Sequence, residues 1–241
     1  EELDKLKKTC PASAAFTIDH RELSENGRMV DVQFVTLGNK DANHRVFMLA
    51  GEHAREFIAA ESALHFLQSL CGQTDVNMNN LLEEVHFQVV VNANEASRRK
   101  AEEGHFCLRV NPSGVDLNRN WDTHWRQSKL KGMETWGGPA AFSEPETRIF
   151  RDLVSDFKPT AFLSIHSGTK AMFTPYAYAP KLPDFNANNM SAMLRELDTK
   201  YCECPFGPAG SELPYLSRGT CMDWVYENLE LKKNLNEILE K

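Results

Sequence analysis

Two residues able to bind one metal ion, His53 and Glu56, lie close together in the segment 49–57. An imidazole and a carboxylate are a usual pair of zinc ligands, and they leave room for a third donor and a water. The apolar run 45–50 before them is typical of a buried strand, and residues 57–70 repeat apolar side chains with a helical period. The pair is therefore predicted to lie where a strand ends and a helix begins, at the sheet edge where α/β proteins bind ligands.

The third donor is predicted to be His166, which directly follows a second apolar run at 160–165. Two histidines and one glutamate with an open fourth position are typical of catalytic zinc sites, whereas structural sites fill all four positions, mostly with cysteine. A His-X-X-Glu pair alone is weak support, because most of the 8 histidines are expected in surface or packing positions. The prediction of one Zn²⁺ therefore depends on the fold bringing His166 to the other two residues.

Between these candidate ligands, residues 114–121 mix polar, cationic and apolar side chains without a period. Arg119 in this segment and Arg109 upstream each offer a rigid fork of donors that suits a carboxylate. Taken alone, each arginine also fits a solvated surface position. Together with a metal site, the two guanidinium groups indicate an anionic substrate.

Six motifs in a fixed order resemble those of the zinc carboxypeptidases of the pancreatic carboxypeptidase A kind, or of their plant or protist relatives. The motifs extend over most of positions 44–226, and several independent matches in the right order make chance agreement negligible. They are His53-Ala54-Arg55-Glu56, residues 114–121, residues 138–147, Ser164-Ile165-His166-Ser167, residues 174–178 and Asp223-Trp224.

The resemblance implies an exopeptidase in which His53, Glu56 and His166 bind zinc and Arg109 polarises the scissile carbonyl. The family's general base, a glutamate on a buried apolar strand, falls by its position on Glu237. Residues 231–241 have instead the period of an amphipathic helix, which would point its glutamates at solvent. We therefore expect Glu237 to lie far from the zinc ligands, and the chain to bind zinc yet hydrolyse peptides poorly.

Three explanations of this departure are open. The C-terminal part of the family fold is truncated, or residues are missing from within the sequence, or Glu237 serves as the base in an altered tail. The first two leave the chain without its base, so a catalytically impaired zinc-binding protein is one alternative function. An amidohydrolase of N-acyl amino acids, which uses the same ligand types on a related sheet, is another, although the long matches at 118–121 and 142–147 argue against it.

On the substrate side, the resemblance implies that Asn118 and Arg119 hold the terminal carboxylate of a peptide or protein. Arg55 would be a secondary substrate contact beside the metal, and Tyr215 the mobile tyrosine that closes over the substrate. Met222 would lie at the base of the specificity pocket, where family members that prefer basic residues carry an acid. Because methionine is uncharged and adaptable, apolar or aromatic C-terminal residues are favoured.

Three further expectations concern the surroundings of the site. The resemblance implies non-proline cis peptides at Ser167–Gly168 and Pro175–Tyr176. Asp116 is a candidate partner for the nitrogen of a ligand histidine that faces away from the metal. Tyr226, which sits too far along the chain to be the mobile tyrosine, is expected to pack in a helix beginning near residue 222.

The length, composition and net charge of the chain reduce the classes of binding partner that it is expected to have. With 241 residues and 41% hydrophobic content, one α/β domain covering residues 1–241 is expected. The net charge of -7 and a pI near 5.7 argue against nucleic acid and anionic membranes. No apolar run approaches the roughly 18 residues of a membrane span. Peptide C-termini are the expected substrate, and a monomer is the expected state.

The 6 cysteines are too widely spaced for a zinc ribbon, and their pairing cannot be deduced from the sequence. Their even number and the glycosylation sequon Asn189-Met190-Ser191 favour a secreted or vacuolar protein over a cytoplasmic one. Residues 1–6 resemble neither a signal peptide nor a natural initiator, so processing or trimming upstream is expected.

The elements that must position these residues alternate between strands and helices. This alternation predicts a mixed, mainly parallel central sheet flanked by helices on both faces. Ser143 and Glu146 are predicted to form a capping box, and the weakly periodic stretch 94–142 to form the substrate cleft. Strands are predicted at 30–37, 45–51, 85–92, 161–166 and 171–178, and helices at 57–71, 143–157 and 184–202.

Overall fold

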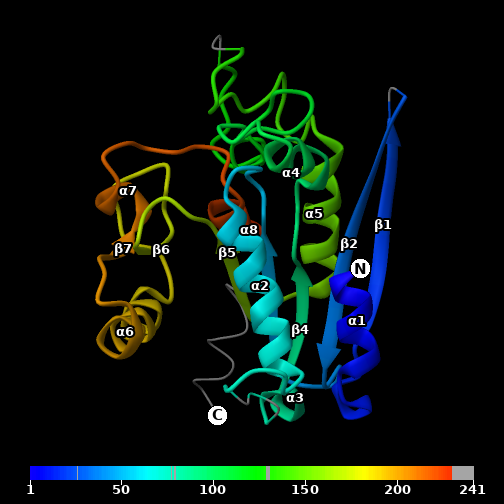
Figure 1. The fold of residues 1–241 in the computed structure, drawn as a ribbon. Helices are drawn as coiled ribbons and strands as arrows, with labels where there is room; N and C mark the ends of the chain where they lie inside the picture. Colours follow the sequence, from blue (N-terminus) through cyan, green and yellow to red (C-terminus); the bar gives the residue numbers. More distant parts are fainter. Residues whose placement is uncertain (26, 77, 79, 129–130, 230–241) are drawn as a thin grey trace.

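A five-stranded sheet in the order β1-β2-β4-β3-β5 lies at the centre of the computed structural model, which describes residues 1–25, 27–76, 78, 80–128 and 131–229. A second, two-stranded sheet, β6-β7, lies apart from it (Figure 1). The strands are β1 (Thr17–Glu25), β2 (Arg28–Gly38), β3 (His44–Ala50), β4 (Val85–Val90), β5 (Ala161–Ile165), β6 (Met172–Thr174) and β7 (Phe206–Pro208). The helices are α1 (Glu2–Thr9), α2 (Phe57–Leu70), α3 (Leu81–Glu84), α4 (Glu95–Glu102), α5 (Pro145–Phe157), α6 (Ala187–Leu197), α7 (Ala209–Glu212) and α8 (Cys221–Asn228).

The central sheet is mixed, as predicted. Strand β3 runs parallel to both β4 and β5, whereas β1 with β2 and β2 with β4 are antiparallel. Within the central sheet, parallel and antiparallel pairs of the described strands are therefore equal in number, instead of mainly parallel. The difference comes from β1, which the sequence pattern does not predict because most of its side chains are exposed and it lacks an apolar face.

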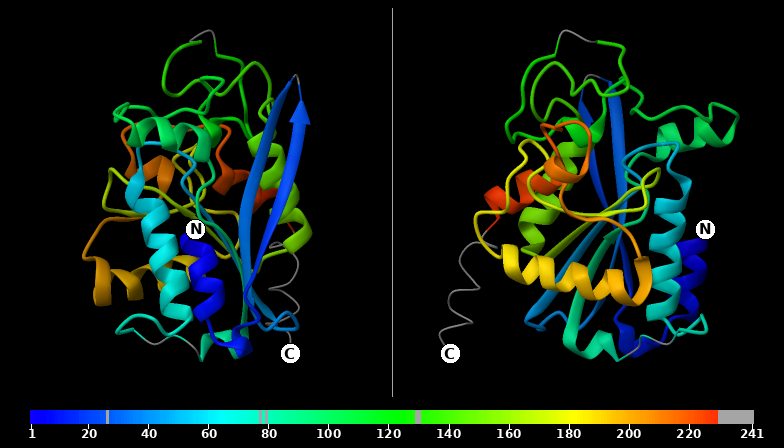
Figure 2. Two further views of the ribbon diagram at one scale, coloured as in Figure 1. Left: turned by 45° about the vertical axis from the view of Figure 1, so that its right-hand side comes forward. Right: turned by 90° about the vertical axis from the view of Figure 1, so that its left-hand side faces the viewer.

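Helices cover both faces of the sheet, as predicted (Figure 2). Successive side chains of β3 enter different cores because a strand alternates its faces. Phe47 and Leu49 pack with α5 and α8, whereas Met48 and Ala50 pack with α1 and α2. Burial on both faces explains why β3 is an almost continuous apolar run. None of the described helices is long and apolar enough to cross a membrane.

Two predicted elements are shorter in the structure than in the prediction by more than two residues. In place of the strand expected at 171–178, only β6 (Met172–Thr174) is extended, and bends follow it. The helix expected at 184–202 begins at Ala187, after Asn186 in a left-handed conformation, and its last turn, Asp198–Cys202, is a π-helix. Helices α1 and α4 were missed because both are short and mostly polar.

The predicted capping box at Ser143 is wrong. Helix α5 begins at Pro145, in agreement with a proline in the first turn, but its N-cap is Glu144 and no side chain caps it. The carboxylate of Glu146 turns instead toward Arg28 and Asn111, with which it forms an ion pair and hydrogen bonds. Glu146 therefore contacts residues distant in the sequence and not the start of its own helix.

Two disulfides pair four of the cysteines. Cys10, which follows α1, is bonded to Cys71 at the end of α2, and Cys202 is bonded to Cys204. Cys107 and Cys221 are free, the first exposed and the second buried. The Cys10–Cys71 bond fastens α1 to α2, the helix whose N-cap is Glu56.

We expect loss of the Cys10–Cys71 bond to destabilise the fold by about 2 to 4 kcal/mol, because it closes a loop of 61 residues in the unfolded chain. Urea unfolding of Cys10→Ser/Cys71→Ser at equilibrium measures the change. The matched control, Cys202→Ser/Cys204→Ser, opens a loop of only 2 residues and should cost less. Equal losses in the two variants would contradict this expectation.

Candidate metal centre

The parallel register of β3 and β5 brings two chain segments to one edge of the sheet. Ala50 and Ile165, the last residues of the two strands, are direct neighbours. His166 follows β5 at once, and the chain turns after β3 at Gly51, whose φ is +76°. A side chain at Gly51 would lie 3.1 Å from the Cα atom of Asn92, so this turn requires glycine.

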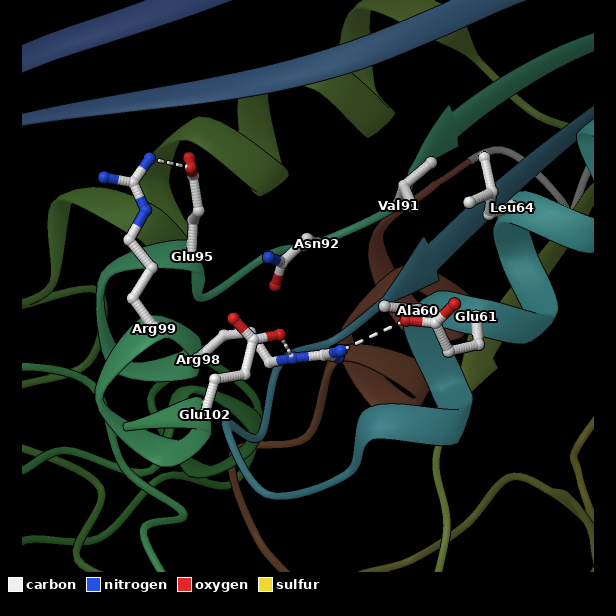
Figure 3. Close-up of a pocket in the computed structure, with 9 residues that line it drawn as sticks. All are labelled: Ala60, Glu61, Leu64, Val91, Asn92, Glu95, Arg98, Arg99 and Glu102. Carbon is white, nitrogen blue, oxygen red and sulfur yellow. Dashed lines mark hydrogen bonds and ion pairs between the residues drawn. The ribbon is translucent and has the colours of Figure 1, made fainter. Parts of the chain in front are cut away.

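Helix α4 holds the start of α2, where Glu56 is the N-cap. The guanidinium of Arg98 lies 4.1 Å from the ring centre of Phe57 and forms ion pairs with Glu61 and Glu102. Figure 3 shows Arg98 reaching from α4 to α2 across the pocket between them. Because this arginine is paired within the pocket, we assign the pocket a structural role and place the functional site elsewhere.

The structure brings the three candidate metal ligands together. Glu56 Oε1 lies 2.7 Å from His53 Nδ1, and Glu56 Oε2 lies 2.9 Å from His166 Nδ1. The two Nδ1 atoms are 3.2 Å apart. His53 and Glu56 are buried, whereas His166 is partly exposed. The group of three side chains is therefore shielded from solvent at His53 and Glu56 and open to solvent at His166.

This donor set fits zinc. Ligand atoms on a tetrahedral Zn²⁺ with bonds of 2.0 to 2.2 Å lie about 3.3 to 3.6 Å apart, slightly farther than the separations found here. Two imidazole nitrogens that face each other can share only one proton, whereas a divalent cation can accept both lone pairs and the carboxylate. The group of potential ligands consists of two histidines and a glutamate and contains no cysteine.

The electrostatics of the group favour an ionised Glu56. Burial opposes its ionisation, but hydrogen bonds from His166 and His53 outweigh burial and hold the pKa of Glu56 well below its usual range. Burial also opposes protonation of His166, yet hydrogen bonds to Glu52 and Glu56 raise the pKa of His166 to about 9. An anionic carboxylate at the centre of the group suits a cation.

Asp116 contacts the outer nitrogen of one candidate ligand, His53 Nε2, at 3.1 Å. This carboxylate is completely buried. Burial alone would raise the pKa of Asp116, but the charges of His53, Arg119 and Arg109 lower it far below its usual range. With Nε2 donating to Asp116, His53 presents the lone pair of Nδ1 to the metal position.

Arg109 lies beside the same group. Its Nε and Nη2 atoms are 3.0 and 2.9 Å from Asp116 Oδ2, and Nη1 lies 3.4 Å from Glu56 Oε1. The backbone fixes this arrangement further, because Ala54 N donates to Arg109 O. The predicted position of Arg109 near the metal ligands therefore agrees with the geometry.

Asn118 and Arg119 lie in the short 3₁₀ turn that follows Asp116. Asn118 Nδ2 is 3.1 Å from His166 Nε2, and Arg119 Nη1 donates to Asn118 O at 2.6 Å. Arg119 also lines a cavity of about 460 Å³ together with Tyr215 and two further arginines. The residues that line this cavity are Arg119, Trp125, Arg126, Ser128, Thr135, Gly137, Tyr215, Leu216, Ser217 and Arg218.

The remaining predicted site residues are less closely associated with the metal position. Arg55 forms a bidentate ion pair with Glu134, which raises the pKa of Arg55. Tyr215 is 57% exposed. Met222 is partly buried in the first turn of α8 and is not one of the residues that line the cavity. Glu237 lies outside the described residues.

The peptide bond Pro175–Tyr176 is cis, as predicted, but the prediction for Ser167–Gly168 is wrong. Gly168 has a φ of +106°, so glycine turns the chain there without a cis bond. Asp223 of α8 holds the segment after the cis bond, accepting hydrogen bonds from the backbone of Ala177 and Tyr178. Burial raises the pKa of Asp223 to about 6.

Tyr226 is buried, and its hydroxyl bonds to the backbone of Phe185 while the two rings stack. It therefore has the packing role expected of it. Sequence reasoning missed Glu52, a buried carboxylate behind His166. The signal was a charged residue directly before His53, at the end of an apolar run.

Comparison with known proteins agrees with this geometry. Residues 1–240 match the profile of one family, described as zinc carboxypeptidase. This chain belongs to the zinc carboxypeptidase family. Carboxypeptidase B of Rattus norvegicus is 31% identical over 217 residues, which cover 80% of this chain and 50% of that protein. Zinc carboxypeptidase A 1 of Drosophila melanogaster is 26% identical over 224 residues, which cover 86% of this chain and 52% of that protein.

A solved structure of bovine thrombin-activatable fibrinolysis inhibitor, in complex with tick carboxypeptidase inhibitor, superimposes with a TM-score of 0.79. The match covers 95% of this chain and 80% of that one, at 22% identity, and shows a shared fold. This member of the zinc carboxypeptidase family spans about half the length of the curated relatives it matches.

We expect Zn²⁺ to raise the midpoint of thermal unfolding, because a ligand that binds only the folded state stabilises it by about 4 kcal/mol at a thousandfold excess over its dissociation constant. His166→Ala removes one of three donors and should abolish most of the shift. Calorimetry of the chelator-treated wild type and variant, each with and without Zn²⁺, measures the two shifts in the unfolding midpoint. His65→Ala, an exposed histidine of α2, is the control and should keep the shift. An undiminished shift in His166→Ala would exclude this residue as a ligand.

Proposed function

We propose that this chain provides the metal-binding and carboxylate-binding parts of a zinc-dependent exopeptidase that removes the C-terminal residue of peptides or proteins. The observation that carries the proposal is the convergence of His53, Glu56 and His166 beside Asn118 and Arg119. Membership of the zinc carboxypeptidase family supports it. We further propose that residues 1–241 belong to a single catalytic domain.

The three ligands would hold one Zn²⁺, which when bound lowers the pKa of a water and polarises a carbonyl. The role of Arg109 follows from its charge and position. Its guanidinium is oriented by Asp116 and lies within 3.4 Å of Glu56, so it would stabilise negative charge that develops on the carbonyl oxygen beside the ligands.

Asn118 and Arg119 would select chain ends. The arginines in the cavity beside them and the absence of a carboxylate among its described lining residues suit an anionic group. An internal peptide bond offers no carboxylate and leaves these donors unpaired, which costs several kcal/mol of binding by the usual penalty for unpaired polar groups. Tyr215, exposed at the same cavity, would cover the bound residue, and Arg55 would be a secondary contact.

The preference for the C-terminal side chain is proposed to follow from Met222. An uncharged, flexible side chain at the base of the specificity pocket favours apolar or aromatic residues over lysine or arginine.

We also propose a secreted or vacuolar location for the protein, because the Cys10–Cys71 and Cys202–Cys204 bonds suit an oxidising compartment.

Two alternative functions make different predictions. A zinc-binding protein without a general base would bind peptides but release no product. The described carboxylates behind the ligands, Asp116 and Glu52, are each engaged with a histidine. The general base assigned to Glu237 therefore stays a prediction from the sequence. An amidohydrolase would cleave an N-acyl aspartate in preference to a blocked dipeptide.

We expect the zinc-loaded chain to bind a blocked dipeptide ending in phenylalanine more tightly than the corresponding C-terminal amide. Arg119→Gln should weaken binding of the free acid by about 10- to 100-fold, the usual effect of losing a charged hydrogen bond, and leave the amide unchanged. Calorimetric titration measures both. Arg21→Gln, an exposed arginine paired with Asp156, is the control and should bind like the wild type.

Chromatographic assay of the released amino acid then separates the alternatives. Release of phenylalanine that is lost on Glu237→Gln would support an active enzyme with its base in the tail. Tight binding without release would support the impaired zinc-binding protein. Equal affinity for acid and amide, or faster cleavage of an N-acyl aspartate, would overturn the proposed exopeptidase.

A further inference from the structure

Glu52 is a buried carboxylate with no role in the chemistry described so far. It lies between Gly51 and His53, is 1% exposed, and its Oε1 atom has no hydrogen-bond partner among the described residues. Its Oε2 atom lies 3.2 Å from Ser164 Oγ, 3.4 Å from His166 Nε2 and 3.5 Å from Cys221 Sγ. Burying a carboxylate with one oxygen unpaired costs stability, so packing alone does not explain a glutamate here.

The groups around His166 Nε2 determine which of them donates a hydrogen bond and which accepts one. His166 Nδ1 faces Glu56 and His53, so a metal bound at Nδ1 requires the proton on Nε2. Ser164 Oγ, at 2.8 Å from Nε2, can accept this proton and then donate its own to Glu52 Oε2. The hydrogen bonds therefore run from His166 through Ser164 to Glu52.

Asn118 does not compete for the Nε2 proton. Its Oδ1 atom accepts a hydrogen bond from Cys221 N at 2.9 Å, which leaves Nδ2, a donor, 3.1 Å from His166 Nε2. This donor cannot accept the Nε2 proton and by itself favours a lone pair on Nε2, an effect that Ser164 and Glu52 must outweigh. Ser164 and Glu52 are then the acceptors that hold the proton in place. Their arrangement parallels that of Asp116 behind His53, so each ligand histidine is backed by a buried carboxylate.

We propose that Glu52 is a positioning residue of the metal site. Through Ser164, and by its direct attraction at 3.4 Å, its carboxylate keeps the proton of His166 on Nε2 and presents the lone pair of Nδ1 to the metal. The inference rests on the proposed zinc site, and it adds a residue that acts through His166 and does not touch the metal or the substrate.

Glu52→Gln tests this role because it keeps the size of the side chain and removes its charge. The affinity for Zn²⁺, measured by competition with a chelator of known affinity, is expected to fall about 10- to 100-fold, the usual effect of losing a partner behind a metal ligand. Ser164→Ala should cause a smaller loss. The double variant should lose less than the sum of the two, because both residues act on one proton.

A second readout does not depend on the affinity for zinc. In zinc-loaded protein, ¹H–¹⁵N spectra should show slow solvent exchange of the His166 Nε2 proton in the wild type, because Ser164 and Glu52 hold it, and faster exchange in Glu52→Gln. Glu52→Asp keeps the carboxylate and should retain more zinc affinity than Glu52→Gln. A residue that only fills space would leave the exchange rate of this proton and the affinity for zinc unchanged in all these variants.

Glu227→Gln is the control. Glu227 of α8 is a partly buried glutamate, with a side chain 24% exposed, but it contacts Thr123 and His124. Its loss should lower stability and leave zinc affinity unchanged. If Glu52→Gln binds zinc with wild-type affinity and its His166 Nε2 proton exchanges at the wild-type rate, this inference alone would be overturned. A wild-type chain that binds no zinc would overturn the proposed function and this inference with it.

Discussion

The carboxylate of Asp116 joins the parts of the site that come from distant stretches of the chain. Its Oδ1 atom contacts the candidate ligand His53 and accepts from the backbone of Asn118, and its Oδ2 atom accepts from Arg109. One fully buried group thus contacts a candidate metal ligand, fixes the start of the turn that carries Arg119, and orients a guanidinium. A buried charge is tolerated only with such partners, so loss of any one of them weakens the others.

A second polar network keeps Asp116 in its place. The side chain of Asn111 accepts from the backbone of Val115 and donates to Glu144 and Glu146 at the start of α5. Burial raises the pKa of Glu146, and the nearby Arg28 of β2 opposes that rise. The loop that carries Asp116 is thereby tied to the sheet and to a helix, which a structureless loop could not achieve.

The sequence predicts those parts of the site that depend on local order. A glutamate and a histidine after an apolar run, and a second histidine after another, predict the three candidate ligands because strand ends meet at one sheet edge. Glu52 and the capping of α5 were not predictable in the same way. Glu52 acquires its role only when Ser164 is placed beside it, and Glu146 leaves its local cap for Arg28 and Asn111. The disulfide pairing depends equally on tertiary structure.

Arg55 shows how a predicted substrate contact and the observed ion pair can be reconciled. Its side chain is 34% exposed and that of Glu134 is 56% exposed, and an ion pair this accessible to water contributes only about 0 to 1 kcal/mol. A ligand carboxylate can therefore displace Glu134 at little cost. Arg109 differs, because it is 13% exposed and bonded to the fully buried Asp116. The structure thus pairs one exchangeable guanidinium with one fixed guanidinium, as a site needs if it must both admit an anion and hold its own geometry.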